Sequence, residues 1–312
     1  GTLDKLEAIP GFRTDLSIDE TQRLANTVGC VICSASEKLV PADRKLYALR
    51  DVTGTVPSIP LITASIMSKK LAEGLDALVL DVKHGSGAFM KSEADARRLA
   101  HSLVETGKRM DVATSALLTD MNQPLGRLIG NALEVDESVA CLEGGGPADL
   151  REVTIALGGE ALTLAGAVST LADGRGMIEN ALDSGGALKK FDEMVAAQGG
   201  DLSATRPLAP ASDVVAERSG VVAQIDTEKL GWAVIELGGG RKRLGDALDH
   251  GVGIEMLVRL GATVETGQPV ARVYSRPATS DAATRLVTDA IRIGDTSGDA
   301  GTPPPLIVDR IS

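Results

Sequence analysis

The chain has 312 residues, a length that suggests about two domains at roughly 100–200 residues each. Hydrophobic residues make up 43% and charged residues 24% of the chain, which excludes general disorder. The 43 acidic and 32 basic residues give a net charge of −11, and this excess of negative charge argues against a nucleic-acid binder that relies on bulk electrostatics.

Cysteine usage and hydropathy bear on the location of the protein. Cys30, Cys33 and Cys141 are an odd number of cysteines in a chain without a secretory leader, so we predict a reducing, cytoplasmic compartment. The C-x-x-C pair lacks a second pair that would complete a zinc site, so we interpret Cys30 and Cys33 as buried strand cysteines. The longest apolar run, 153–172, is interrupted by Glu160 and three glycines, which favours a packed helix over a membrane span.

Local patterns predict the first elements. A capping-box pattern from Ser17 to Glu20 predicts a helix over 17–27, and the apolar run 28–33 predicts a strand that is covered on both faces. Two helical segments surround a turn at 53–57. The second of them begins at Pro60, because proline suits a first helical turn where an N–H would be unpaired anyway, and it ends near 73.

A β-α-β pattern follows these helices. Its parts are a strand over 77–83, a glycine-rich turn over 84–89, a helix over 92–106 and a strand over 112–119. We expect two parallel strands joined by a right-handed crossover. Helical patterns then dominate to residue 197, and they divide into 130–142, 147–172 and 177–197.

A composition break at 198–212, rich in glycine, proline and serine, is the clearest domain boundary. Beyond it we predict strands over 214–225, 232–237 and 270–274, helices over 252–260 and 280–291, and a tight β corner over 261–270. The predicted fold class is α/β, with a mostly parallel sheet flanked by helices, part of a small helical domain, and a C-terminal α+β barrel-like domain.

Two groups of residues could carry chemistry. The glycine turn that begins at His84 follows a predicted parallel strand, where backbone amides can meet an anion, but a structural turn explains it equally well. His84 could act as an acid or base, although a turn histidine is favoured. Ser65 and Lys69 are four residues apart on one predicted helix and could act with Arg50, but spacing alone favours a solvated helix face.

Several segments of the sequence resemble the thymidine/pyrimidine-nucleoside phosphorylase family, and this resemblance favours a functional site at these residues over a purely structural role. They occur in the family's order and cover essentially the whole chain. These segments are 1–12, 47–53, 58–70, 81–90, 117–126 and 130–135. The resemblance implies phosphorolysis, in which a pyrimidine nucleoside, with thymidine expected, and phosphate give free base and (deoxy)ribose 1-phosphate. Uridine remains open as a substrate.

The resemblance also implies roles for individual residues. Arg50, Ser65 and Lys69 match the positions that bind the base. Arg50 and Lys69 are expected to act in catalysis by stabilising negative charge on the departing base, and Ser65 to orient it. Tyr47 and Ile62 are expected to line the pocket.

On the phosphate side, Thr2 matches a phosphate ligand of the family. No cofactor is expected beyond phosphate as co-substrate, except a potassium ion held by the main-chain oxygens of Leu125 and Leu128 and the carboxylate of Glu137. His84 stands where the family more often has valine or another small residue.

The implied domains are an α/β phosphate-side domain over 1–41 and 73–206, a segment of the helical pyrimidine-binding domain over 42–72, and a C-terminal domain over 207–312. The family's phosphate loop and its Ser-Gly-Arg-Gly segment precede the residues matched here. We therefore expect a fragment, the last two-thirds of an enzyme that is a homodimer when intact, with negligible phosphorolysis by itself.

Two alternatives stay open at this point. A related phosphoribosyltransferase such as the anthranilate type is one, although the set of Arg50, Ser65 and Lys69 argues against it. A non-catalytic binding fragment is the other. Neither nucleic acid nor a membrane is expected as a partner.

Overall fold

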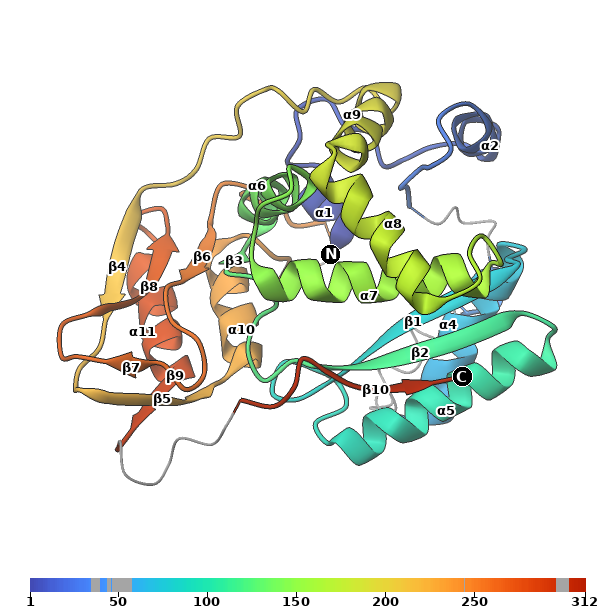
Figure 1. Cartoon of the computed structure of the whole chain (residues 1–312). Helices are drawn as coiled ribbons and strands as arrows, with labels where there is room; N and C mark the ends of the chain where they lie inside the picture. The colour runs from blue at the N-terminus through green and yellow to red at the C-terminus, as the bar shows by residue number, and fades with distance from the viewer. Residues whose placement is uncertain (35–39, 44–45, 47–57, 244, 296–302) are drawn as a thin grey trace. The chain divides into compact units, whose positions relative to one another are not determined.

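The computed structural model describes residues 1–34, 40–43, 46, 58–243, 245–295 and 303–312 (Figure 1). Contacts within the chain define two compact units. Unit 1 consists of Gly1–Ser34, Asn122–Leu150 and Leu182–Pro303, and unit 2 of Ala35–Met121, Arg151–Ala181 and Pro304–Ser312. These units cut across the three predicted domains without testing them, so the domain boundaries stay a prediction. The mixed α/β class is confirmed.

Unit 2 contains the predicted β-α-β unit. β1 (Ala77–His84) and β2 (Ala113–Asp120) pair in parallel along their whole lengths, and α5 (Glu93–Arg109) connects them. Leu99, Leu103 and Val104 of α5 are buried in the core shared with these strands. The other strand pairings in the described ranges are antiparallel, so the parallel part of the fold within this chain is the β1–β2 pair.

A strand near the end of the sequence joins this sheet. β10 (Ile307–Ile311) pairs with β2 in antiparallel orientation, giving the order β1-β2-β10 (Figure 1). The sequence analysis predicted no element in this stretch. α4 (Ile59–Ala72) packs on α5, with Pro60 in its first turn as predicted.

The helical region over 147–197 is divided into helices differently from the prediction. The predicted helices 147–172 and 177–197 are wrong, because three helices occupy this stretch: α7 (Ala148–Leu164), α8 (Leu171–Asp183) and α9 (Gly186–Ala197). Gly166 has φ +72° and Gly185 has φ +75°, so both adopt the left-handed conformation that ends helices. α6 (Asn131–Leu142) agrees with its prediction.

The N-terminal part of unit 1 has a core between α1 (Thr2–Leu6), α6 and α9. Leu6, Ile9 and Phe12 pack there against Val135 and Val195. The helix predicted from the capping box is confirmed as α2 (Ile18–Thr27), because the Glu20 amide donates to the Ser17 hydroxyl and the Glu20 carboxylate accepts from the Ser17 amide.

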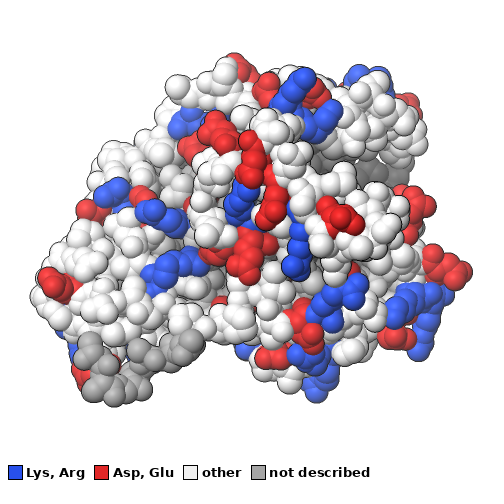
Figure 2. Space-filling view, in the orientation of Figure 1, with Lys and Arg blue, Asp and Glu red and all other residues white. Residues whose placement is uncertain are grey.

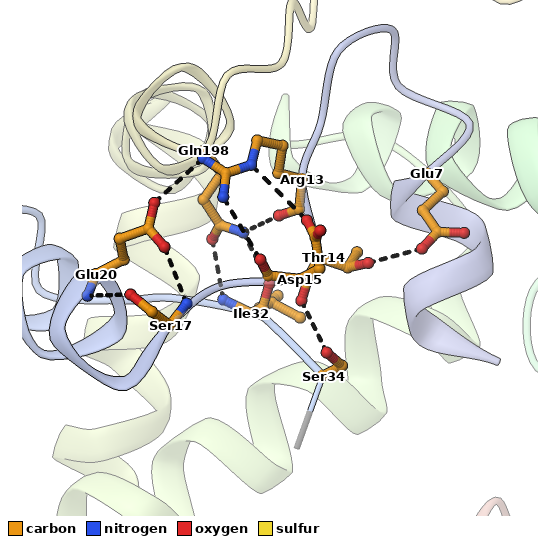
Figure 3. Close-up of polar contacts among 9 residues, drawn as sticks. All are labelled: Glu7, Arg13, Thr14, Asp15, Ser17, Glu20, Ile32, Ser34 and Gln198. Atoms are coloured by element: carbon orange, nitrogen blue, oxygen red, sulfur yellow. Dashed lines mark hydrogen bonds and ion pairs between the residues drawn. The ribbon is translucent and has the colours of Figure 1, made fainter. Parts of the chain in front are cut away.

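The strand predicted over 28–33 is wrong. Residues 30–34 form no strand, and the Gln198 side chain takes the place of a strand neighbour (Figure 3). Its Oε1 accepts from the Ile32 amide at 3.1 Å and its Nε2 donates to the Ile32 carbonyl at 2.8 Å. Cys30 and Cys33 are therefore not buried strand cysteines, since both are partly exposed, whereas Cys141 is buried in α6.

The C-terminal part of unit 1 contains two antiparallel sheets. The first has the order β3 (Leu128–Ile129), β6 (Gly253–Met256), β8 (Pro269–Tyr274), β4 (Ala211–Val215), and the second the order β7 (Thr263–Val264), β5 (Gly220–Ile225), β9 (Ile291–Gly294). The helices α10 (Thr227–Leu237) and α11 (Ser280–Ala290) share a core with these strands. The predicted strand over 270–274 and the helix over 280–291 are confirmed.

Three predictions in this part are wrong. Residues 232–237 belong to α10, where Leu230, Ala233 and Leu237 recur at helical spacing and are buried. Residues 253–256 form β6 rather than a helix, because this strand is buried on both faces and so lacks alternation. The strand predicted over 214–225 is two strands, β4 and β5, in different sheets.

Acidic and basic side chains are interspersed on the face shown in Figure 2. None of the helices in the described ranges combines the length and the apolar character needed to cross a bilayer.

Candidate active site

Ser65 and Lys69 meet on one face of α4, as their spacing predicted. The Lys69 ammonium donates to the Ser65 hydroxyl at 2.9 Å. Asp43 joins them from the preceding helical residues 41–43, and its Oδ2 lies 2.5 Å from Lys69 Nζ and 3.1 Å from Ser65 Oγ. Ser65 is only 7% exposed, so its hydroxyl depends on these partners.

Asp43 was missed in the sequence, because it precedes its two partners by 22 and 26 residues and no helical or strand period links such positions. Arg50 and Tyr47, predicted for the base site, lie outside the described residues. The predicted trio therefore has two members in the described structure, Ser65 and Lys69, and these two are in direct contact.

A cavity of about 500 Å³ within unit 2 has Ser65 among its lining residues. Its size is within the range of small-molecule sites. Ile62 is one of its lining residues, and its role in a base pocket stays a prediction. The other lining residues come from α4, β1, the glycine turn, α5 and the end of β2: Ser65, Ile66, Leu80, Asp81, Val82, Lys83, Gly87, Ala88, Phe89, Met90, Leu99, Leu103 and Met121.

Most of these lining side chains are apolar. The polar ones on β1, Asp81 and Lys83, bond to each other and to Thr119 of β2. Lys83 Nζ lies 2.7 Å from Asp81 Oδ2 and 3.2 Å from Thr119 Oγ1, and the Thr119 hydroxyl donates to Asp81 Oδ1. Asp81 and Lys83 alternate on β1, and Thr119 is the register partner of Lys83 on β2. This alternation of charges within an otherwise apolar strand was the available signal, and the sequence analysis assigned it no role.

Phe89 is a second residue that the analysis missed. It lines the cavity, yet it is 76% exposed, which is unusual for a large aromatic side chain. Its position in a glycine-rich turn, in a chain with only 2% aromatic residues, was the signal. An aromatic face beside an apolar cavity can stack on a flat ring.

The glycine turn is held by main-chain bonds. The Met121 amide donates to the His84 carbonyl at 2.7 Å, and the Gly87 amide to the Met121 carbonyl at 3.1 Å. His84 is buried, and its Nε2 has no hydrogen-bond partner within the described part of the chain. It is not among the residues that line the cavity, so no role for it follows from the geometry.

Thr2, the predicted phosphate ligand, begins α1 in unit 1, and its side chain is exposed. A contact of Thr2 with phosphate stays a prediction.

The residues predicted for potassium lie together in unit 1, around one buried carboxylate. Glu137 is 8% exposed, and its Oε1 accepts from the amides of Arg127 at 2.9 Å and Leu128 at 3.2 Å. Gly126 has φ +70°, and a Cβ there would lie 2.2 Å from Glu137 Oε2, so the loop closes around the carboxylate only with glycine at this position.

The charge of Glu137 is poorly compensated by side chains. Burial raises the pKa of this carboxyl, its two amide hydrogen bonds oppose the rise, and the nearby Asp149 and Glu134 add to it. A cation could supply the missing compensation. Groups of three or more His, Cys, Asp or Glu side chains suited to a metal ion do not occur in the described ranges, so a cation here would rely on main-chain oxygens such as those predicted at Leu125 and Leu128.

Comparison with known proteins identifies the family to which the sequence is similar. Residues 1–188 match the glycosyl transferase family, a/b domain, and residues 221–294 match the pyrimidine nucleoside phosphorylase C-terminal domain. The chain is 49% identical to a thymidine phosphorylase of Mycobacterium tuberculosis (strain H37Rv) over 316 residues, which cover 100% of this chain and 71% of that protein.

Two further relatives are also named as phosphorylases. A pyrimidine-nucleoside phosphorylase of Bacillus subtilis (strain 168) is 46% identical over 299 residues, covering 94% of this chain and 69% of the relative. A thymidine phosphorylase of Burkholderia cenocepacia (strain HI2424) is 46% identical over 319 residues, covering 100% of this chain and 72% of the relative.

Proposed function

The chain belongs to the thymidine/pyrimidine-nucleoside phosphorylase family, and we propose from this that its protein transfers the pentosyl group of a pyrimidine nucleoside to phosphate. The products are the free base and (deoxy)ribose 1-phosphate. Thymidine is the expected nucleoside, because the relatives include thymidine phosphorylases, and uridine remains open, because a pyrimidine-nucleoside phosphorylase matches the chain at similar identity.

In this proposal the base occupies the cavity beside α4. As the N-glycosidic bond breaks, the sugar gains positive charge and the departing base gains negative charge. The Lys69 ammonium, together with the predicted Arg50, stabilises that negative charge, and the Ser65 hydroxyl orients the ring. Ile62 and Phe89 provide apolar surface for the faces of the ring.

The observation that carries this proposal is the position of Ser65, which lines a cavity large enough for a base and is bonded to Lys69. Lys69 donates to Ser65 at 2.9 Å, and Ser65 lines the cavity. A hydroxyl at a mostly apolar wall, with an ammonium bonded to it, gives the few fixed polar groups that a small-molecule site needs.

Phosphate is the second substrate in this proposal, and Thr2 is its ligand on this chain. The phosphate loop of the family does not occur within these 312 residues. We therefore expect the chain by itself to have negligible phosphorolysis activity, and we place turnover in a longer polypeptide that acts as a homodimer in the cytoplasm.

A potassium ion fits the loop around Glu137. The main-chain oxygens of Leu125 and Leu128 and the Glu137 carboxylate would hold it, and the ion would supply a fixed positive charge that stabilises the loop. The fit rests on the buried carboxylate with its raised pKa and on the close approach of Gly126. A monovalent cation compensates this charge without a second acidic side chain.

Calorimetric titration of the chain with thymine tests the base site. We expect Lys69→Ala to weaken thymine binding at least about tenfold, because a hydrogen bond from a charged donor is worth about 1.5–3 kcal/mol. Lys70→Ala is the matched control, since Lys70 is the next residue on α4 and pairs with Glu73 at 3.0 Å. Equal thymine affinities of the parent chain and Lys69→Ala would contradict the proposed site.

A further inference from the structure

The loop that encloses Glu137 in unit 1 is also held by an ion pair. Arg259 follows β6, and its Nη1 donates to the carbonyls of Pro124 at 2.8 Å and Gly126 at 2.6 Å. Its Nη2 donates to Asp149 Oδ2, and the same oxygen accepts from the Gly126 amide at 3.1 Å. One arginine–aspartate pair therefore binds both the carbonyl and the amide of Gly126.

These bonds single out one carbonyl of the loop. Leu125 lies between the two residues whose carbonyls Arg259 binds, and its own carbonyl accepts no hydrogen bond from the part of the chain that the structure describes. Main-chain carbonyl oxygens are ligands that hard cations prefer. The Leu125 carbonyl is therefore available to a cation, while its two neighbours are occupied.

Two carboxylates flank Gly126. Asp149 accepts from the Gly126 amide, and a Cβ at Gly126 would lie 2.2 Å from Glu137 Oε2. Burial raises the pKa of Glu137 most, and the negative charge of Asp149 adds to the rise, so the two carboxylates are within electrostatic range of each other. Arg259 compensates one of these two charges, which leaves the group of three side chains with a net charge of about −1.

The neighbouring charged side chains do not change this balance. Glu134 pairs with Lys5, and Arg127 pairs with Glu255 at 2.8 Å, so the charges cancel within each pair. A monovalent cation would bring the loop to neutrality. A divalent cation would leave an excess positive charge beside Glu137, which is only 8% exposed, and uncompensated charge is costly where water is excluded.

We propose that Arg259 makes this loop select a monovalent cation over a divalent one, by compensating Asp149 and by occupying the carbonyls on both sides of Leu125. This rests on the potassium ion proposed above. Arg259 is a positioning residue in this scheme, since its contacts are with the loop and with Asp149. Its repulsion acts twice as strongly on a divalent as on a monovalent ion, because Coulomb energy is proportional to charge.

Three variants separate the charge of Arg259 from the shape of the loop. Arg259→Gln removes the charge, and its amide can still donate to a carbonyl, so the net charge of the loop becomes about −2. Arg259→Lys keeps both the charge and the donor capacity. The double variant Arg259→Gln with Asp149→Asn removes one charge of each sign and returns the net charge to about −1.

The test is a set of thermal melts in potassium chloride and in calcium chloride, with choline chloride keeping the ionic strength equal. Calcium is the divalent probe because its flexible coordination accepts carbonyl and carboxylate oxygens. The rise in Tm with cation concentration gives the apparent affinity for each cation. For the parent chain we expect a larger rise with potassium than with calcium.

In Arg259→Gln we expect this order to reverse, with the ratio of calcium to potassium affinity rising at least about tenfold. Arg259→Lys and the double variant should keep the parent order. Arg276→Gln is the matched control, since Arg276 pairs with Asp249 at 2.8 Å outside this loop, and it should also keep the parent order.

The outcomes separate this inference from the potassium site itself. Absence of a potassium-dependent rise in the parent chain overturns the site and the inference together. A potassium-dependent rise in the parent, with the parent order kept in Arg259→Gln, overturns the inference alone, and so does a reversed order in Arg259→Lys or in the double variant. If Arg259→Gln does not fold, Asp149→Asn decides, because it makes the loop less negative: the ratio of calcium to potassium affinity must fall, and an unchanged ratio overturns the inference.

Discussion

Each unit contains a buried glutamate, and the pKa values of the two carboxyls are shifted in opposite directions. Glu160 on α7 in unit 2 is 2% exposed, and Glu137 on α6 in unit 1 is 8% exposed. Burial tends to raise the pKa of both carboxyls. Burial is the largest single influence on the pKa of Glu160, but hydrogen bonding and the positive charges of Arg310 and Arg175 together outweigh it and lower this pKa, whereas the pKa of Glu137 is raised.

The difference lies in the type of partner. Arg310 of β10 binds Glu160 through two contacts of its Nε, at 2.8 and 2.9 Å, and a third contact of its guanidinium at 2.6 Å. Glu137 has backbone amides instead, which carry only partial charge. The carboxylate of unit 2 is thus compensated by the chain's own C-terminal strand, and that of unit 1 is left with a charge that a bound cation could offset.

Removing Arg310 should produce the largest effect on stability. A fully buried ion pair that loses one partner costs about 3–5 kcal/mol, and we expect about 2–3 kcal/mol for Arg310→Ala because this arginine side chain is 42% exposed. Urea unfolding at neutral pH measures the loss. Arg98→Ala, which breaks the exposed pair with Asp95, should cost under about 0.5 kcal/mol.

A double variant checks the cause of this loss. Glu160→Gln removes the charge that Arg310→Ala leaves unpaired, so the combination should be more stable than Arg310→Ala alone. If adding Glu160→Gln brings no recovery, the loss comes from packing of β10 and not from the buried charge.

A smaller effect is expected from potassium at Glu137. A cation that binds only the folded chain raises the free energy of unfolding by about 1.4 kcal/mol when its concentration is tenfold above Kd. Thermal melts in potassium chloride and in choline chloride at equal ionic strength measure this increment. Glu137→Gln should abolish it, and Glu73→Gln should retain it. An increment of the same size in Glu137→Gln would exclude this carboxylate as the ligand.

Whether a contact in these two regions could be predicted from the sequence depended on how far apart its two residues are in the sequence. Ser65 and Lys69 were predicted to share a face because positions four apart on a helix always do. Asp43 and Arg310 were missed because their partners lie far away in the sequence, at 22 and 150 positions. No local period encodes such contacts.

The same distinction explains the fold predictions. The helices α2 and α4 and the strands β1 and β2 were predicted because caps, a proline and a β-α-β pattern mark them locally. Residues 232–237 were predicted as a strand but belong to a helix, whereas residues 253–256 were predicted as part of a helix but form a strand. A short apolar run is compatible with both structures until its packing partners are known. β10 was missed because its place depends on pairing with β2, nearly 200 residues earlier.

The smallest effect, and the most direct comparison of the two glutamates, is the pH dependence of stability. Glu160 has a folded-state pKa below its ordinary value of 4.5, so its stabilisation is present above pH 4.5 and is lost as pH falls through the lowered pKa. Glu137 has a folded-state pKa above 4.5, so its contribution is most favourable below pH 4.5 and is lost as pH rises through the raised pKa. Urea unfolding of the parent chain, Glu160→Gln and Glu137→Gln in choline buffers measures both trends. As pH rises from 4 to 7, the parent should gain stability relative to Glu160→Gln and lose it relative to Glu137→Gln, and trends of the same sign would show that the two carboxylates are compensated alike.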